Sequence, residues 1–140
     1  MNKQNEKGFT MVELIIVVAI MGIIGAMLIP SFAKMSAKAK LTTDISTTKT
    51  LQRLVESYNA EYTPEIAGNS TLAQVANSLS SVGLLDNATV EVKTNTAYIA
   101  LSDGRMRFNS TAVGTAGGKL SQAMEDLSKK DPSLVTVWCY

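Results

Sequence analysis

The feature that most constrains this chain is a long uncharged interval near its N-terminus. After Glu13 no ionisable side chain appears until Lys34, and residues 14–33 read L-I-I-V-V-A-I-M-G-I-I-G-A-M-L-I-P-S-F-A. A helix of this length spans about 30 Å, which matches the hydrocarbon thickness of a bilayer. The apolar residues surround the helix instead of forming one stripe, so the segment suits lipid or deep burial. The rest of the 140-residue chain is too small to surround it.

The composition excludes most catalytic and metal-binding chemistry. The chain has no His and a single Cys, Cys139, so it lacks the parts of a Cys/His zinc site, a His-based catalytic triad or an internal disulfide. Its 13 Lys and Arg residues balance 12 Asp and Glu residues, which gives no basic excess for binding nucleic acid. We therefore expect a single small domain that is not an enzyme, has no cofactor and does not bind nucleic acid.

Two explanations of the apolar segment compete. An ordinary secretory signal has a basic start, an apolar stretch of about 7–15 residues and a small-x-small cut site. Lys3 and Lys7 supply a basic start, and the A-K-A sequence at residues 37–39 would serve as the cut site. On this reading a secreted soluble domain begins near Lys40. The other explanation lies just before the apolar run.

Residues 7–14 read K-G-F-T-M-V-E-L. This octet resembles the processing signature of type IV prepilins and the related pseudopilins. The resemblance implies that a prepilin peptidase cuts between Gly8 and Phe9, that residues 1–8 are a leader, and that Phe9 is then N-methylated. It also implies a Glu at the fifth mature position, where Glu13 stands.

The likeness extends into the apolar segment. Gly22 and Pro30 match in spacing a Gly and a Pro that family members often carry in their first helix. The resemblance covers residues 7–40, about a quarter of the chain. It implies that residues 9–33 form a helix that spans the membrane in the precursor and forms the core of a filament after assembly.

Physical chemistry gives Glu13 a role independently of the family. A charged side chain at the centre of a membrane helix costs about 2.5–3.5 kcal/mol, so it needs a partner or a proton. Lys34 is about 30 Å away along a helix. A cut after Gly8 would create an α-amine at Phe9, and a neighbouring copy could offer that amine to Glu13. We therefore expect Glu13 and Phe9 to act in assembly. Two alternatives remain: a weaker contact between the two residues within one helix, and a Glu13 that only reaches the lipid headgroups.

Gly22, Gly25 and Pro30 predict a weak point in the helix. Proline in a helix interior removes one backbone hydrogen bond and clashes with the preceding turn. We expect a bend or local melting between Gly22 and Pro30, and the resemblance implies that this stretch loses helicity when subunits pack into a filament. The plainer alternative is that both glycines are packing positions, because small residues let membrane helices approach closely.

After Pro30 the helix is predicted to continue as an amphipathic segment. Residues 34–63 carry apolar or small side chains at steps of three and four, and most charged residues lie off this stripe. Pro64 and Gly68 end the helix, which we expect to run from about Phe9 to Tyr62. The stripe consists of Leu41, Ile45, Thr48, Leu51, Leu54, Val55, Tyr58 and Tyr62.

Residues 64–140 are predicted to form a globular α+β head. Helical spacing within residues 72–85 indicates a helix that ends at Gly83, and a second helix is indicated over residues 119–129 with Leu120, Met124 and Leu127 inward. Alternation indicates strands over residues 89–93, 97–101, 105–108 and 134–140, with a hairpin turn at Asp103-Gly104 and a loop around Gly114, Gly117 and Gly118. The fold class is α+β: a long N-terminal helix packed across a small antiparallel sheet.

The head offers little chemistry of its own. Asp86, Asn87, Asp103 and Asp131 could seed a calcium site, but carboxylates at turns usually satisfy local backbone, so we expect no metal. Arg105 and Arg107 lie on one strand face, which is either a ligand patch or, as we expect, a solvated face. Many Gram-negative pilins close this region with a disulfide, and Cys139 has no partner for one.

The resemblance implies a structural subunit of a type IV pilus, with roles of the adhesion and motility type. Such a chain is a single-pass precursor in the cytoplasmic membrane, surrounded by lipid, before an assembly platform and its ATPase machinery add it to an extracellular homopolymer. The alternatives are a pseudopilin of a type II secretion system and a competence pilin. The positive-inside rule does not orient the chain, because two lysines (Lys3 and Lys7) precede the apolar segment and three, at residues 34, 38 and 40, follow it. The outward orientation therefore rests on the processing signature.

Overall fold

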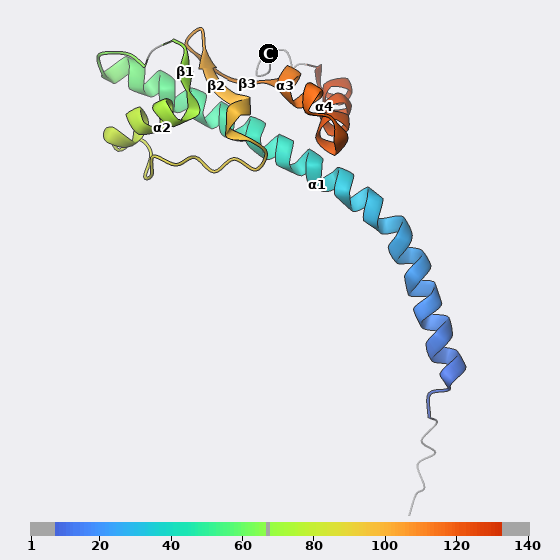
Figure 1. The fold of residues 1–140 in the computed structure, drawn as a ribbon. Helices are drawn as coiled ribbons and strands as arrows, with labels where there is room; N and C mark the ends of the chain where they lie inside the picture. Colours follow the sequence, from blue (N-terminus) through green and yellow to red (C-terminus); the bar gives the residue numbers. More distant parts are fainter. Residues whose placement is uncertain (1–7, 67, 133–140) are drawn as a thin grey trace, which may run out of the picture. The chain divides into compact units, whose positions relative to one another are not determined.

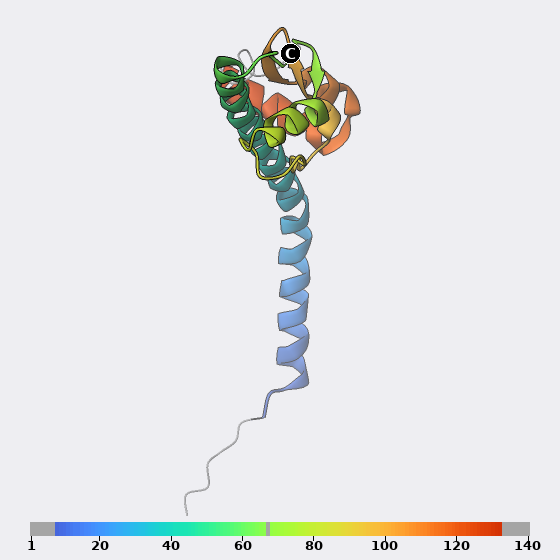
Figure 2. The same cartoon turned by 90° about the vertical axis from the view of Figure 1, so that its left-hand side faces the viewer.

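The computed structural model describes residues 8–66 and 68–132 (Figures 1 and 2). The elements in chain order are the helix α1, the strand β1, the helix α2, a 3₁₀ turn η1, the strands β2 and β3, and the helices α3 and α4. The chain divides between Ala33 and Lys34 into two compact units. The predicted strand over residues 134–140 and Cys139 lie outside the described residues.

The helix α1 runs from Met11 to Glu61 and passes through both units. In the first unit every large apolar side chain of the helix is exposed, from Val17 at 41% to Met11 at 83%. Its most apolar 18-residue window has a mean hydropathy of 2.8 and is not buried at all. By length and composition, α1 is the one helix among the described residues that could cross a membrane. The predicted apolar segment is therefore helical, and the described residues do not bury it.

The second half of α1 is the base on which the head is built. Leu41, Ile45, Leu51 and Val55 of the predicted stripe are buried in the core, and Thr48 is buried with them. Leu54 and Tyr58 pack against this core at half exposure. The helix ends at Glu61, before Pro64 as predicted. The periodicity of the stripe therefore identified most of the buried face from Leu41 to Val55, but Tyr62 is exposed and lies beyond the helix.

The sheet has three antiparallel strands in the order β1-β2-β3, namely Ser70–Thr71, Ile99–Ser102 and Arg105–Phe108. The predicted hairpin is confirmed: Ser102 pairs with Arg105, and the turn residues Asp103 and Gly104 have φ values of 53° and 74°. Both turn residues take the left-handed conformation that such hairpins require. The sheet buries Ile99, Leu101, Met106 and Phe108.

The predicted strand over residues 89–93 is wrong. This stretch has no regular structure, although Val90 and Val92 do pack against the core as their alternation suggested. The backbone N–H of Lys93 donates to the carboxylate of Asp44 at 2.8 Å instead of joining a strand. The sequence also gave no sign of β1, which has only two residues. The predicted strand over residues 97–101 begins later, at Ile99, because η1 (Thr96–Tyr98) precedes it.

The remaining helices cover the sheet and α1. The helix α2 (Leu72–Ser81) begins with a capping box between Thr71 and Gln74 and ends just before Gly83, the predicted end, where the chain turns with φ of 77°. The predicted glycine loop contains a further short helix, α3 (Ser110–Ala116). The helix α4 (Gly118–Lys130) agrees with its prediction and buries Met124 and Leu127.

Asp44 is the buried carboxylate of the head. We had placed it off the buried stripe, yet it is fully buried. Its Oδ1 accepts from the Lys93 N–H at 2.8 Å, and its Oδ2 accepts from the Thr94 N–H at 2.8 Å and from the Thr94 hydroxyl. A buried charge is tolerated only when it is bonded in this way. Asp44 therefore fixes residues 93 and 94 to α1.

We predict that Asp44→Ala destabilises the head by about 3 kcal/mol, because it leaves the part-buried backbone donors of Lys93 and Thr94 unpaired and removes a fully buried side chain. Denaturation of the full chain in detergent micelles, with amide exchange at Lys93 and Thr94, measures the effect. The matched control is Asp86→Ala at an exposed position, which should change the stability by less than about 0.5 kcal/mol. Unchanged exchange at Lys93 and Thr94 in Asp44→Ala would contradict the assignment.

Candidate assembly site

The N-terminal end of the described chain presents an accessible peptide bond between Gly8 and Phe9. Both residues are exposed and precede the helix, with Phe9 at 78% exposure. A Cβ added at Gly8 would meet no atom within 4 Å. The predicted cleavage point therefore lies in an uncrowded, non-helical stretch immediately before α1.

Glu13 folds back onto the start of its own helix. Its Oε2 accepts from the Thr10 N–H and from the Thr10 hydroxyl, both at 2.9 Å, while the Glu13 N–H donates to the Thr10 hydroxyl oxygen at 3.3 Å. This reciprocal pair is a capping box, in which two residues three apart satisfy helix donors that otherwise lack a partner. We had not predicted this role, although the Thr10-x-x-Glu13 spacing is its signal.

The capping box uses only one oxygen of the Glu13 carboxylate. Within the described residues, Oε1 of Glu13 makes no hydrogen bond, and the ion pairs there join Lys93 to Glu91 and Lys129 to Glu125. The weaker contact between Phe9 and Glu13 within one helix depends on the α-amine that a cut after Gly8 would create, so it stays a prediction. Glu13 is thus an exposed carboxylate at the edge of the apolar segment, with one oxygen available.

The expected weak point in α1 is helical in this structure. The helix is unbroken from Gly22 through Pro30. The bend or melting that we expect in this stretch, and its loss of helicity in a filament, stay predictions. Pro30 has no N–H to donate to the carbonyl of Ala26, and the flanking turns hold the helix without that bond. An added Cβ at Gly22 or Gly25 would meet nothing within 4 Å, so neither glycine is a packing position within its own chain.

The other candidate residues do not form a second site. Among the described residues no group of three or more His, Cys, Asp or Glu side chains could hold a metal ion, so Asp86, Asp103 and Asp131 do not gather into the calcium site that we considered. Arg105 is exposed and Arg107 is half-buried. The Nε of Arg107 is buried, and among residues 8–66 and 68–132 it finds no hydrogen-bond partner, which is unusual for a polar atom.

Comparison with known proteins bears on these residues directly. Residues 3–29 match a family described as the prokaryotic N-terminal methylation motif, and this range includes Gly8, Phe9 and Glu13. A fimbrial protein of Pseudomonas aeruginosa is 30% identical over 131 residues, which are 90% of this chain and 80% of the relative. The chain belongs to the type IV pilin family.

Two further relatives agree with this membership in the pilin family. A fimbrial protein of Neisseria meningitidis is 36% identical over 100 residues, and the match spans 70% of this chain and 58% of that protein. A type IV major pilin protein of Myxococcus xanthus is 42% identical over 55 residues, which are 39% of this chain and 25% of the relative. No solved structure matches the chain. The pilin match therefore rests on sequence, and it extends well beyond the N-terminal motif.

Proposed function

We propose that this pilin is a structural subunit that polymerises through its N-terminal helix into an extracellular filament. The observation that carries the proposal is the uncharged apolar helix of residues 14–33, which is uncovered in the single chain and begins at a carboxylate with one available oxygen. The precursor is inserted in the cytoplasmic membrane, where lipid covers this helix. In the filament, the helices of other copies replace the lipid.

Processing would prepare the subunit for this exchange. A prepilin peptidase cuts between Gly8 and Phe9, and the new α-amine of Phe9 is N-methylated. A methylated amine still binds a proton near neutral pH, so Phe9 carries a positive charge that the precursor lacks. The capping box depends only on atoms of Thr10 and Glu13, so it survives the cut. The helix start therefore stays ordered while its charge changes.

Glu13 then has two simultaneous partners. Its Oε2 caps its own helix through Thr10, and its Oε1 accepts from the Phe9 ammonium of a neighbouring copy. The pair removes the cost of carrying a carboxylate into an apolar filament core, where an unpaired charge is strongly unfavourable. An assembly platform and its ATPase machinery lift the subunit from the membrane, and the pairing selects copies in the correct axial position.

We predict that the mature chain begins at an N-methylated Phe9. Mass analysis of the N-terminus of filament or membrane material measures this directly. Conversion of Gly8 to a bulkier residue such as Val should leave the leader attached. A mature start near Lys40 would instead support the secreted soluble domain and would remove the proposal.

We predict that Glu13→Gln abolishes filaments and that Thr10→Val does not. The Gln amide oxygen can still cap the helix, but it cannot form an ion pair, so each subunit loses an interaction of about 1.5–3 kcal/mol. This loss corresponds to roughly tenfold to hundredfold weaker addition. Thr10→Val breaks the cap at a cost of about 1 kcal/mol and keeps the charge.

Electron microscopy of sheared filaments, with immunoblots of the membrane fraction, separates the two variants. Glu13→Gln should accumulate in the membrane with its leader removed. If Thr10→Val loses filaments and Glu13→Gln keeps them, Glu13 acts only as a helix cap and the intermolecular pairing is wrong.

A further inference from the structure

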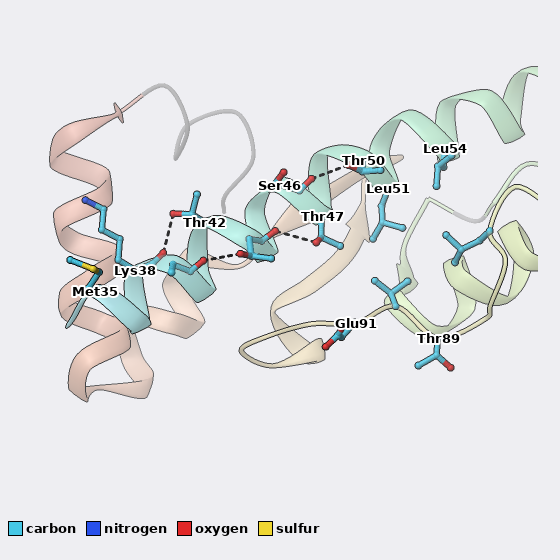
Figure 3. Close-up of a pocket in the computed structure, with 14 residues that line it drawn as sticks. Met35, Lys38, Thr42, Ser46, Thr47, Thr50, Leu51, Leu54, Thr89 and Glu91 are labelled. Carbon is cyan, nitrogen blue, oxygen red and sulfur yellow. Dashed lines mark hydrogen bonds between the residues drawn. The ribbon is translucent and has the colours of Figure 1, made fainter. Parts of the chain in front are cut away.

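The head carries a groove beside the second half of α1. It has a volume of about 870 Å³ and lies between α1 and the irregular stretch that carries Leu85 and residues 89–91. In Figure 3, Thr47, Leu51 and Leu54 point from the helix toward the stretch that carries Thr89 and Glu91. All residues that line this groove belong to the second unit.

The floor of the groove is less polar than its residue types suggest. Thr43, Thr47 and Thr50 each donate their hydroxyl to the backbone carbonyl four residues earlier, at 2.9, 3.1 and 3.2 Å (Figure 3). Their hydroxyl protons are thus used inside the helix, and the side chains have no donor left for a ligand. With Leu51 and Leu54 beside them, they form a surface of small and apolar groups.

The opposite wall is held in place. Residues 93 and 94 are fixed to α1 by the buried Asp44 carboxylate, so the stretch that carries Val90 and Glu91 is anchored at its end. At the rim, the Lys93 ammonium donates to Glu91 and lowers the pKa of that carboxyl below its ordinary value. The charge of Glu91 is therefore paired, and Lys38 is the remaining charged residue of the lining.

We propose that this groove receives the apolar helical segment, residues 14–33, of a second copy of the chain. That segment carries no charge and its large apolar side chains are all exposed, so it matches a groove whose floor threonines have their hydroxyl donors engaged within α1. Small floor residues such as Thr43 and Thr47 let a second helix approach closely. The proposal rests on the proposed function, because it assumes that copies assemble through their N-terminal helices.

The axial position of the second copy follows from the helix rise. The pairing of Phe9 with Glu13 offsets two parallel copies by four residues, about 6 Å. Placing the middle of an apolar segment, near Ile23, beside Thr47 needs an offset of about 24 residues, or about 36 Å. The offset at the groove is therefore larger than the offset at the N-terminus. The copy that enters the groove lies further along the filament than the copy that supplies the Phe9 amine. This second contact would tie together subunits that the N-terminal pairing does not join.

Cysteine cross-linking in assembled filaments tests the contact. In a Cys139→Ser background, Thr47→Cys is combined in turn with Ile20→Cys, Met21→Cys and Ala26→Cys, which lie about 100–140° apart around the apolar helix. Disulfides need Cβ atoms about 3.5–4.5 Å apart, so only a seated helix should link. We expect oxidation to give disulfide-linked multimers for at least one combination, with the linked peptides identified by mass spectrometry.

The matched control replaces Thr47→Cys with Ser57→Cys, an exposed position on the same helix outside the groove. It should give no multimers with any of the three partners. Filaments that form normally but show no link at Thr47 would overturn the groove contact and leave the N-terminal pairing standing. Links from Thr47 to a residue of another head would also overturn it. Loss of filaments in the parent chain itself would count against the proposed function.

Filling the groove provides a second readout that needs no cross-link. Thr43 is exposed, so Thr43→Trp should leave the head folded while its indole occupies the groove. We expect at least roughly tenfold fewer filaments at an unchanged level of processed subunit in the membrane, and normal filaments for Ser57→Trp. Normal filaments in Thr43→Trp would contradict an occupied groove.

Discussion

The need to cover one uncharged helix determines the rest of this molecule. Between Glu13 and Lys34 the chain carries no charged side chain and, apart from Ser31, no polar one, and the described residues do not bury its large apolar side chains. Large exposed apolar surfaces mark membrane or protein interaction sites. Lipid can meet this need before assembly and sister helices can meet it afterwards. On our proposal, this pilin is therefore a subunit whose stable state includes other molecules.

The carboxylates of Asp44 and Glu13 are stabilised in different ways. Asp44 is buried and is satisfied entirely within one chain, by donors of Lys93 and Thr94. Glu13 is exposed and only half satisfied, because Thr10 engages one of its two oxygens. Asp44 has its hydrogen-bond donors within one chain and fixes a loop of the head. On our proposal, the second oxygen of Glu13 gains a donor only when another subunit supplies the Phe9 amine.

The sequence predicted the features that depend on local periodicity and turn chemistry. The stripe from Leu41 to Val55 and the Asp103-Gly104 hairpin were both correct, because side-chain spacing and left-handed turn residues are visible in a few neighbouring positions. The prediction of a strand over residues 89–93 was wrong because the backbone N–H of Lys93 donates to Asp44, which lies 49 residues away in the sequence. The two-residue strand β1 is too short to show any alternation.

The candidate site was predicted unevenly for related reasons. The resemblance identified Gly8, Phe9 and Glu13 by spacing alone, and the pilin relatives support that motif. The capping role of Glu13 was not predicted, although the Thr10-x-x-Glu13 spacing indicates it. The groove beside α1 could not be predicted, since its wall is positioned by a tertiary contact of Asp44.

The central claim is that the chain has no stable monomeric state in water. Sedimentation of the purified full-length chain, first in detergent and then after detergent removal, tests it most directly. The account predicts a monomer in detergent micelles and large assemblies or precipitate once the detergent is gone. A folded monomer that remains soluble without detergent would contradict it.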